Sequence, residues 1–242
     1  MFERPHHNAI ATILAALDDR LLLEARCFLG GGTAIVLALD EYRDSVDIAF
    51  FCSSQEGYRL LRSTAFDRGL DGLLKPGAEV AALRDMRADQ YGMRTQIGVG
   101  NAKVRFEIVR EARIPISGTF DPVLGVPVLS RDDMYCERLL ANADHHADRS
   151  VLNRDIIDLS MMISRFGPIP EAAWSKAKGA YGETVVNAYD KAAQAIHDPR
   201  WLRTCMTRMG MDLDLAHEIL PIHGGSVASS DGITPYGNSY SM

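Results

Sequence analysis

The N-terminal part of the chain contains two kinds of hydrophobic pattern. Apolar residues at helical spacing predict an amphipathic helix over residues 8–25, and a second helix is expected over 33–42, after a glycine-rich turn. The segment VDIAFF (46–51) is short, β-branched and aromatic, which predicts a buried strand. A third helix is expected over 57–68, so helices and strands alternate early in the chain.

The middle of the chain carries strand patterns, and the rest carries helical ones. We expect strands within residues 80–100 and 103–111, joined by a hairpin turn at Gly98 and Gly100–Asn101. Helical spacing then predicts helices over residues 131–144, 153–166, 171–197, 199–209 and 212–220. This order predicts an α+β fold with a helical C-terminal part.

The change of pattern near residue 128 predicts two domains. Residues 1–128 would form the core and residues 129–222 a helical domain. Residues 223–242 are small, polar and rich in glycine, and they contain too few apolar residues to offset the entropy of ordering them. We therefore predict a flexible tail there.

Composition narrows the class of protein. The chain has 242 residues, of which 47% are hydrophobic, enough to form a substantial core. No apolar run reaches the roughly 18 residues that span a bilayer, and no signal-peptide pattern precedes the first helix, so we expect a cytoplasmic protein without membrane contact. Four widely spaced cysteines form no CxxC pair, which argues against a zinc knuckle or a disulfide framework and favours buried thiols. A net charge of −6 means that any polyanionic partner would need a local basic patch.

Two acidic residues interrupt otherwise apolar strands. Because side chains alternate along a strand, Asp47 shares a face with Ala49 and Phe51, opposite Val46, Ile48 and Phe50. In KVRFEIV, alternation likewise places Glu107 with Arg105 and Val109, opposite the buried Val104, Phe106 and Ile108. A charge among apolar strand residues is costly unless it is paired or bound to a metal, so Asp47 and Glu107 are candidates for one shared site.

The glycines at 30–32 open the second predicted helix. A helix N-terminus directs unpaired backbone N–H groups and the positive end of its dipole at whatever lies in front of it, which makes a phosphate cradle of Gly31 and Gly32. Thr33 could add a hydroxyl donor. The alternative is a tight turn with no ligand.

The order of these motifs resembles the DNA-polymerase-β-like nucleotidyltransferase superfamily, and most closely its AbiEii/AbiGii-type toxins. That pattern has a glycine turn, a helix, and then a strand with two acidic residues; here it reads Gly31-Gly32-Thr33 and then Arg43-x-Ser45-x-Asp47. The segment SRDDMYCERLLANADHHADRSVLNRDIIDL (130–159) is similar to the helical segment of the family. The resemblance spans about residues 28 to 165 and implies a polymerase-β-like core with a mixed sheet.

In enzymes that look like this, the glycine turn holds the triphosphate and three carboxylates hold two divalent metals, Mg²⁺ or Mn²⁺. By position, Asp47 and Glu107 match two of these ligands. The remaining position is Ala49, which cannot bind a hard cation, so we expect this chain to be severely impaired in nucleotidyl transfer. Ala49 has three explanations: an engineered knockout, a naturally inactive relative, or replacement of the missing ligand by Asp44 or Glu41.

Further residues carry over from the resemblance. Arg43 and Ser45 would position the nucleotide, although Arg43 could instead pair on the surface with Asp44 or Glu41. Arg138 stands where the family usually has lysine and would contact phosphate.

The second cluster lies at 153–158. Asp155 would orient Arg138 or a catalytic group, and Asp158 could hold two helices together. The alternative is a helix start capped by Asn153, with acids favoured in its first turn. Adjacent side chains diverge on a helix, so the pair 145–146 is expected to be surface histidines.

The leading hypothesis is a nucleotidyltransferase toxin that transfers a nucleotide from an NTP to an acceptor such as a tRNA 3′ end and has a cognate antitoxin. Arginines and Lys103 around the later strands would give this acidic protein a local basic surface for RNA. One alternative is a small-molecule transferase of the aminoglycoside-modifying kind. The other is an inactive regulatory module that binds nucleotide or RNA.

Overall fold

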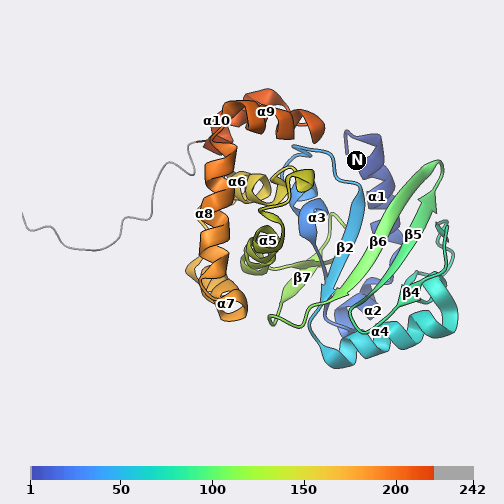
Figure 1. Ribbon diagram of the computed structural model, residues 1–242. Coiled ribbons are helices and arrows are strands. Elements are labelled where there is room, and N and C mark those ends of the chain that lie inside the picture. Colours follow the sequence, from blue (N-terminus) through green and yellow to red (C-terminus); the bar gives the residue numbers. More distant parts are fainter. Residues whose placement is uncertain (1, 221–242) are drawn as a thin grey trace, which may run out of the picture.

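A mixed sheet forms the centre of the computed structural model, which describes residues 2–220 (Figure 1). Its strand order is β3-β5-β6-β2-β1-β8-β7, with β4 also paired to β5. The strands are β1 (Cys27–Gly30), β2 (Asp47–Cys52), β3 (Ala81–Ala82), β4 (Arg87–Ala88), β5 (Gly92–Val99), β6 (Ala102–Arg110), β7 (Gly118–Asp121) and β8 (Val126–Leu129). The pairs β2–β6 and β1–β8 are parallel and the others are antiparallel, so the sheet is mixed as expected.

Helices pack on both faces of this sheet, and most of them follow it in the chain. They are α1 (Pro5–Ala16), α2 (Asp19–Glu24), α3 (Gly31–Ala38), α4 (Gln55–Arg68), α5 (Arg131–His145), α6 (Arg154–Phe166), α7 (Glu171–Tyr181), α8 (Thr184–Ile196), α9 (Pro199–Arg208) and α10 (Ala216–Ile219). Short 3-10 turns are η1 (Gly69–Leu73), η2 (Arg149–Val151) and η3 (Leu213–Leu215). The expected α+β class with a helical C-terminal part is confirmed.

Different helices pack against the two faces of the sheet. The face formed by alternate residues of β2, β5 and β6 packs against α1, α2 and α4 and includes Ile48, Phe50 and Phe106. On the opposite face, Phe28 and Leu129 of β1 and β8 pack with α3 and the C-terminal helices. Figure 1 shows α5 to α8 gathered beside β2, while β6 and β5 extend away from them. The second face is therefore covered at one end of the sheet only.

Two helices end earlier than the pattern predicts. The expected helix over 8–25 is divided because Asp18 caps α2, accepting hydrogen bonds from the backbone N–H groups of Arg20 and Leu21. The expected helix over 171–197 divides at Gly182, which has φ +63° and ends α7. In both cases a capping or turn residue divides a segment whose apolar residues continue at helical spacing.

Smaller corrections concern turns and strands. The helix expected over 33–42 ends at Ala38, because Asp40 and Glu41 adopt positive φ. Strands β1, β7 and β8 had no predicted counterpart, since each is only four residues long. The hairpin turn at Gly100–Asn101 is confirmed, but Gly98 lies inside β5. Val46 precedes β2 and is exposed rather than buried.

The expected domain division stays a prediction. Its boundary near residue 128 falls in β8, and α5 begins two residues after that strand ends. The predicted tail at 223–242 lies outside the described residues. All four cysteines are buried and unbridged, as expected.

Phe106 gives a direct test of the core. Its ring is fully buried and lies 6.0 Å, between ring centroids, from that of Phe50. We expect Phe106→Ala to lower the free energy of unfolding by about 3 to 5 kcal/mol, because it removes apolar contacts and leaves a cavity. Phe66→Ala is the control: that side chain is 89% exposed, so a change of less than about 0.5 kcal/mol is expected in urea denaturation. Equal effects would contradict this description of the core.

Candidate functional site

A cleft of about 280 Å³ lies where the glycine turn, β2, β6, α5 and α6 meet. The residues that the sequence nominates for the site all line it: Gly31, Gly32, Thr33, Arg43, Ser45, Asp47, Ala49, Glu107, Arg138 and Asp155. They come from segments far apart in the chain. Their convergence is a geometric finding, whereas their individual roles stay predictions.

Strand register brings the acidic positions together. Gly30 of β1 is the cross-strand partner of Ala49, and Ala49 in turn is the partner of Glu107 on β6. Asp47 lies two residues before Ala49 and therefore on the same face. Adjacent strands are about 4.8 Å apart, so the turn, position 49 and Glu107 form one row across the sheet.

The glycine turn is shaped by what packs against it. Gly31 has φ +68°, a conformation that favours glycine, and it begins α3. A Cβ at Gly32 would clash with Nη2 of Arg43, so only glycine lets that guanidinium approach. The first N–H groups of α3 have no carbonyl partner within their helix, which makes the turn suited to an anion.

Two hydroxyls secure the turn from inside the protein. Oγ1 of Thr33 donates to the backbone carbonyl of Asp47, and Oγ of Ser45 lies 2.6 Å from that same Oγ1. Since Thr33 has only one hydroxyl hydrogen, Ser45 must be the donor of the second bond. Both hydrogens therefore join the start of α3 to the start of β2, and a phosphate could take either only by breaking these bonds.

Arg43 is buried, and all three nitrogens of its guanidinium donate hydrogen bonds within the protein. Its Nε and Nη2 each donate to one carboxylate oxygen of Asp158, at 2.7 Å, and its Nη1 donates to the backbone carbonyl of Asp44. The guanidinium is not paired with the side chain of Asp44 or Glu41, as the surface alternative would require. Burial by itself would lower the pKa of Arg43, but the carboxylate of Asp158 outweighs it and raises the pKa.

Asp158 links the helical part to this loop, and Asp155 binds side chains of α5. Asp158 also accepts a hydrogen bond from the Tyr42 hydroxyl at 2.5 Å, and Arg138 Nη1 lies 3.4 Å from it. Asp155 pairs with Arg138, and its role in orienting that side chain stays a prediction. Burial raises the pKa of Asp155, but the hydrogen bond from His145 and the charge of Arg138 outweigh it and lower the pKa.

The loop before β2 is held by the N-terminal segment, which the sequence did not indicate. Glu41 accepts hydrogen bonds from the backbone N–H groups of Glu3 and Arg4, and from Nδ1 of the buried His7 at 2.7 Å. Nε2 of His7 accepts from the N–H of Ser45, so the ring is neutral with its hydrogen on Nδ1. These contacts support the backbone that carries Arg43 and Ser45.

Three more cleft residues were missed or misjudged, namely Arg113, Glu137 and His145, and Arg154 of the predicted cluster at 153–158 also lines the cleft. His145 was expected on the surface, but its Nδ1 lies 3.0 Å from Asp155 and its ring lines the cleft. The available signal was spacing, because residues 134, 137, 138, 141, 144 and 145 form one stripe along α5. Asn153 does not cap α6 with its side chain, which instead accepts from the Trp201 indole.

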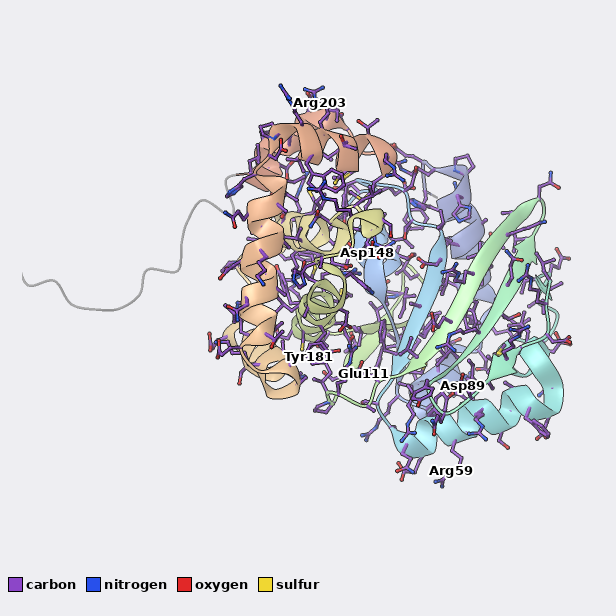
Figure 2. The ribbon with its side chains drawn as sticks, viewed as in Figure 1. Arg59, Asp89, Glu111, Asp148, Tyr181 and Arg203 are labelled. Atoms are coloured by element: carbon purple, nitrogen blue, oxygen red, sulfur yellow. The ribbon has the colours of Figure 1, made fainter. Side chains whose placement is uncertain are left out.

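Arg113 and Glu137 belong to a second charge cluster at the edge of the cleft, in which Glu111 and Glu137 are buried and Arg113 is partly exposed. Arg113 pairs with Glu111 and donates to Glu137 at 3.2 Å and to the hydroxyl of Tyr181 at 3.0 Å. Glu111 and Tyr181 therefore lie close together where the segment after β6 meets α7 (Figure 2). Burial and the charge of Glu111 raise the pKa of Glu137 to about 8.

The acidic residues present do not fit a two-metal site. Position 49 has no donor atom, and Glu107 is ion-paired with Arg94, whose Nε lies 2.7 Å from its carboxylate. Within residues 2–220, no group of three aspartate, glutamate, histidine or cysteine side chains is placed to hold a metal ion. Asp44 and Glu41 are absent from the cleft lining, which argues against either replacing the missing ligand.

Asp158 is the residue on which this charge network depends most. We expect Asp158→Asn to lower the free energy of unfolding by about 3 to 5 kcal/mol, because it leaves the buried Arg43 without its carboxylate. Asp132→Asn on the exposed side of α5 is the matched control and should change stability by less than about 0.5 kcal/mol. Identical urea midpoints for the two variants would rule out this dependence.

Comparison with solved structures finds chains of low sequence identity. Solved structures that are similar include a candidate nucleotidyltransferase from H. pylori, at 13% identity and TM-score 0.48, with 90% of this chain and 92% of that chain covered. JHP933 from Helicobacter pylori matches at 14% identity and TM-score 0.36, with coverage of 84% and 100%. An antigenic nucleotidyltransferase-like protein from Paracoccidioides brasiliensis matches at 9% identity and TM-score 0.38, with coverage of 90% and 94%. No curated protein matches the chain significantly.

The assignment comes from the sequence family. A family model described as "Nucleotidyl transferase AbiEii toxin, Type IV TA system" matches residues 12–219, which includes every residue that lines the cleft. None of the helices in the described part of the chain is long and apolar enough to cross a membrane. The chain belongs to the AbiEii family of nucleotidyltransferase toxins from type IV toxin–antitoxin systems.

Proposed function

We propose that the cleft binds the NTP of a nucleotidyl transfer reaction, and that Ala49 leaves the chain as written severely impaired in the transfer step. The observation that carries this proposal is the row formed by Gly30, Ala49 and Glu107 across adjacent strands. It puts the free N–H groups at the start of α3 beside the position where a carboxylate is missing. A triphosphate on the turn would then lie next to Asp47 and Glu107.

The residues that the sequence nominated for nucleotide binding each have a proposed role. The N–H groups of Gly31 and Gly32 bind phosphate, because they are the free donors at the helix start. Thr33, Ser45 and Arg43 position the turn and β2 from behind, since their donors are already engaged within the protein. Arg138 faces the cleft with Asp155 behind it, and its Nε has no partner among the described residues.

Family membership implies a divalent cation, Mg²⁺ or Mn²⁺, held by Asp47, Glu107 and a further acid. Hard cations need several oxygen ligands, and this chain supplies two carboxylates, one of which is neutralised by Arg94. No catalytic step through a metal is therefore assigned to it. Among the explanations of Ala49, an engineered knockout and a naturally inactive relative both agree with this arrangement.

The incomplete set of acidic residues also favours a second function, that of a nucleotide-binding regulatory module. The turn and the basic residues of the cleft are intact, whereas the acidic set is incomplete. Such a protein would bind NTP without turnover. The small-molecule transferase remains an outcome of the activity test, because no contact described here favours an aminoglycoside over RNA.

We infer an RNA acceptor, such as a tRNA 3′ end, from the charge of the sheet face beside the cleft. Arg84, Arg87, Arg94 and Arg105, here called the basic face, line a hollow of about 870 Å³. Arg94 is the cross-strand partner of Glu107 and of Arg87, and Arg105 is the partner of Asp47, so the basic face continues the row of the site. It would attract a phosphate backbone despite the net charge of −6.

The cellular setting follows from the family. A toxin of a type IV system acts together with an antitoxin, and we propose a cognate antitoxin protein as the partner of this chain. We also propose that it acts in the cytoplasm, where NTPs and tRNA are present. The contacts of the antitoxin are not assigned.

Ala49→Asp tests the missing ligand. We expect this variant to transfer label from at least one of the four NTPs to total RNA in Mg²⁺, at least about a hundredfold faster than the chain as written, because the third carboxylate is restored. Ala49→Asn is the control of equal size without charge and should stay inactive. Label on an aminoglycoside but not on RNA would select the small-molecule alternative. NTP binding without turnover by Ala49→Asp would select the regulatory module.

The basic face has its own test. We expect the double variant Arg84→Glu/Arg87→Glu to bind a single-stranded oligoribonucleotide more weakly and to flatten the slope of log affinity against log salt by about 1.4, if each arginine meets one phosphate. Arg59→Glu/Arg203→Glu makes the same charge change on α4 and α9, away from the cleft (Figure 2). Equal losses in both variants would mean that only bulk charge attracts RNA.

A further inference from the structure

The basic side chains of the cleft differ in how completely their charge is paired with carboxylates of the protein. Five line it: Arg43, Arg113, Arg138, Arg154 and His145. Carboxylates bind the first three, through Asp158, Glu111 with Glu137, and Asp155. Their charge is therefore largely balanced inside the protein. A triphosphate carries several negative charges, so the cleft needs cations that are less completely balanced.

Arg154 and His145 meet that requirement, the latter because it shares the single carboxylate of Asp155 with Arg138. Arg154, at the start of α6, makes no hydrogen bond or ion pair with any residue in the described range, and its Nε is buried without a partner. The side chain of His145 is 46% exposed, and only its Nδ1 has a hydrogen-bond partner among the described residues. The two side chains come from different helices and line the same cleft.

Asp155 fixes the orientation of the imidazole. Its Oδ2 accepts from Nδ1 of His145 at 3.0 Å, while its Oδ1 binds Arg138. Asp155 is itself buried, so this carboxylate is a rigid support. With Nδ1 held in this way, Nε2 is the nitrogen left to meet a ligand.

We propose that protonated His145, oriented by Asp155, binds the phosphate chain of the nucleotide in this cleft together with Arg154. The proposal rests on the proposed NTP binding and adds a proton-dependent contact to it. Asp155 is a positioning residue here, because it acts through His145.

The charges around His145 set the direction of the pH effect. The hydrogen bond to Asp155 raises the pKa of His145, and burial lowers it. The charges of Asp155 and Asp144 also raise this pKa, whereas the charge of Arg154 lowers it. The net shift of the pKa is upward. Two further charged groups lie near His145: Arg138, which is paired with Asp155, and Asp148, in the segment between α5 and α6 (Figure 2). His145 therefore gains its charge as the pH falls through this raised pKa and loses it as the pH rises. NTP affinity should follow the same course.

Calorimetric titration of the full chain with each NTP, in EDTA to exclude metals, tests this from about pH 6 to about pH 8.5. We expect His145→Gln to weaken binding by about fivefold to tenfold at the acid end and to converge with the unmodified chain at the alkaline end. His145→Arg should bind tightly over the whole range, because its charge does not titrate. His146→Gln is the matched control, since that neighbouring ring bonds a backbone carbonyl on α5 and does not line the cleft.

The phosphate of the NTP also titrates near neutrality, but it does so identically with every variant. The difference between His145→Gln and the unmodified chain therefore isolates the imidazole. Equal pH profiles for these two would overturn the proposal. A loss of affinity that is the same at every pH would also overturn it, because that result indicates a structural role. If no NTP binds the chain or any variant, the proposed function itself fails, which is a separate and recognisable result.

Discussion

The buried carboxylate of Asp158 is the interaction on which the arrangement of the cleft depends. Asp158 belongs to α6, yet it binds the guanidinium of Arg43 and the hydroxyl of Tyr42, both in the loop that leads into β2. A buried guanidinium is costly without a paired carboxylate, so this loop can adopt its position only when the helical part is packed on the sheet. One ion pair thus joins the two halves of the chain at the site.

The ion pair between Arg43 and Asp158 also determines the packing behind the glycine turn. The guanidinium of Arg43 lies where a side chain on residue 32 would be, and Thr33 and Ser45 tie the same turn to the first residue of β2. The turn is therefore supported from behind by groups that use up their own hydrogen-bonding capacity. What faces the cleft is backbone N–H, which is suited to phosphate because it carries no competing charge.

Some charges that line the cleft are paired with opposite charges inside the protein, and others are not. Arg43, Arg113 and Arg138 are each matched by carboxylates, which stabilises the fold and leaves little charge for a ligand. Position 49 lacks a charge altogether: its methyl group lies opposite Glu107 and two residues along β2 from Asp47, and Glu107 is neutralised by Arg94. The proposed phosphate contacts and the proposed metal ligands therefore involve different residues, and only the set of metal ligands is incomplete.

The sequence alone determined the strand alternation at Asp47, Ala49 and Glu107, the helical class of the C-terminal part and the family motifs, because these depend on local periodicity and spacing. It did not reveal the short strand β1, the pairing of Arg43 with Asp158, or the place of His145 in the cleft. Those features depend on strand pairing, on a partner 115 residues away in the case of Arg43, and on which face of α5 meets the sheet. Only tertiary packing decides them, since burial determines which charges must be paired and which remain available to a ligand.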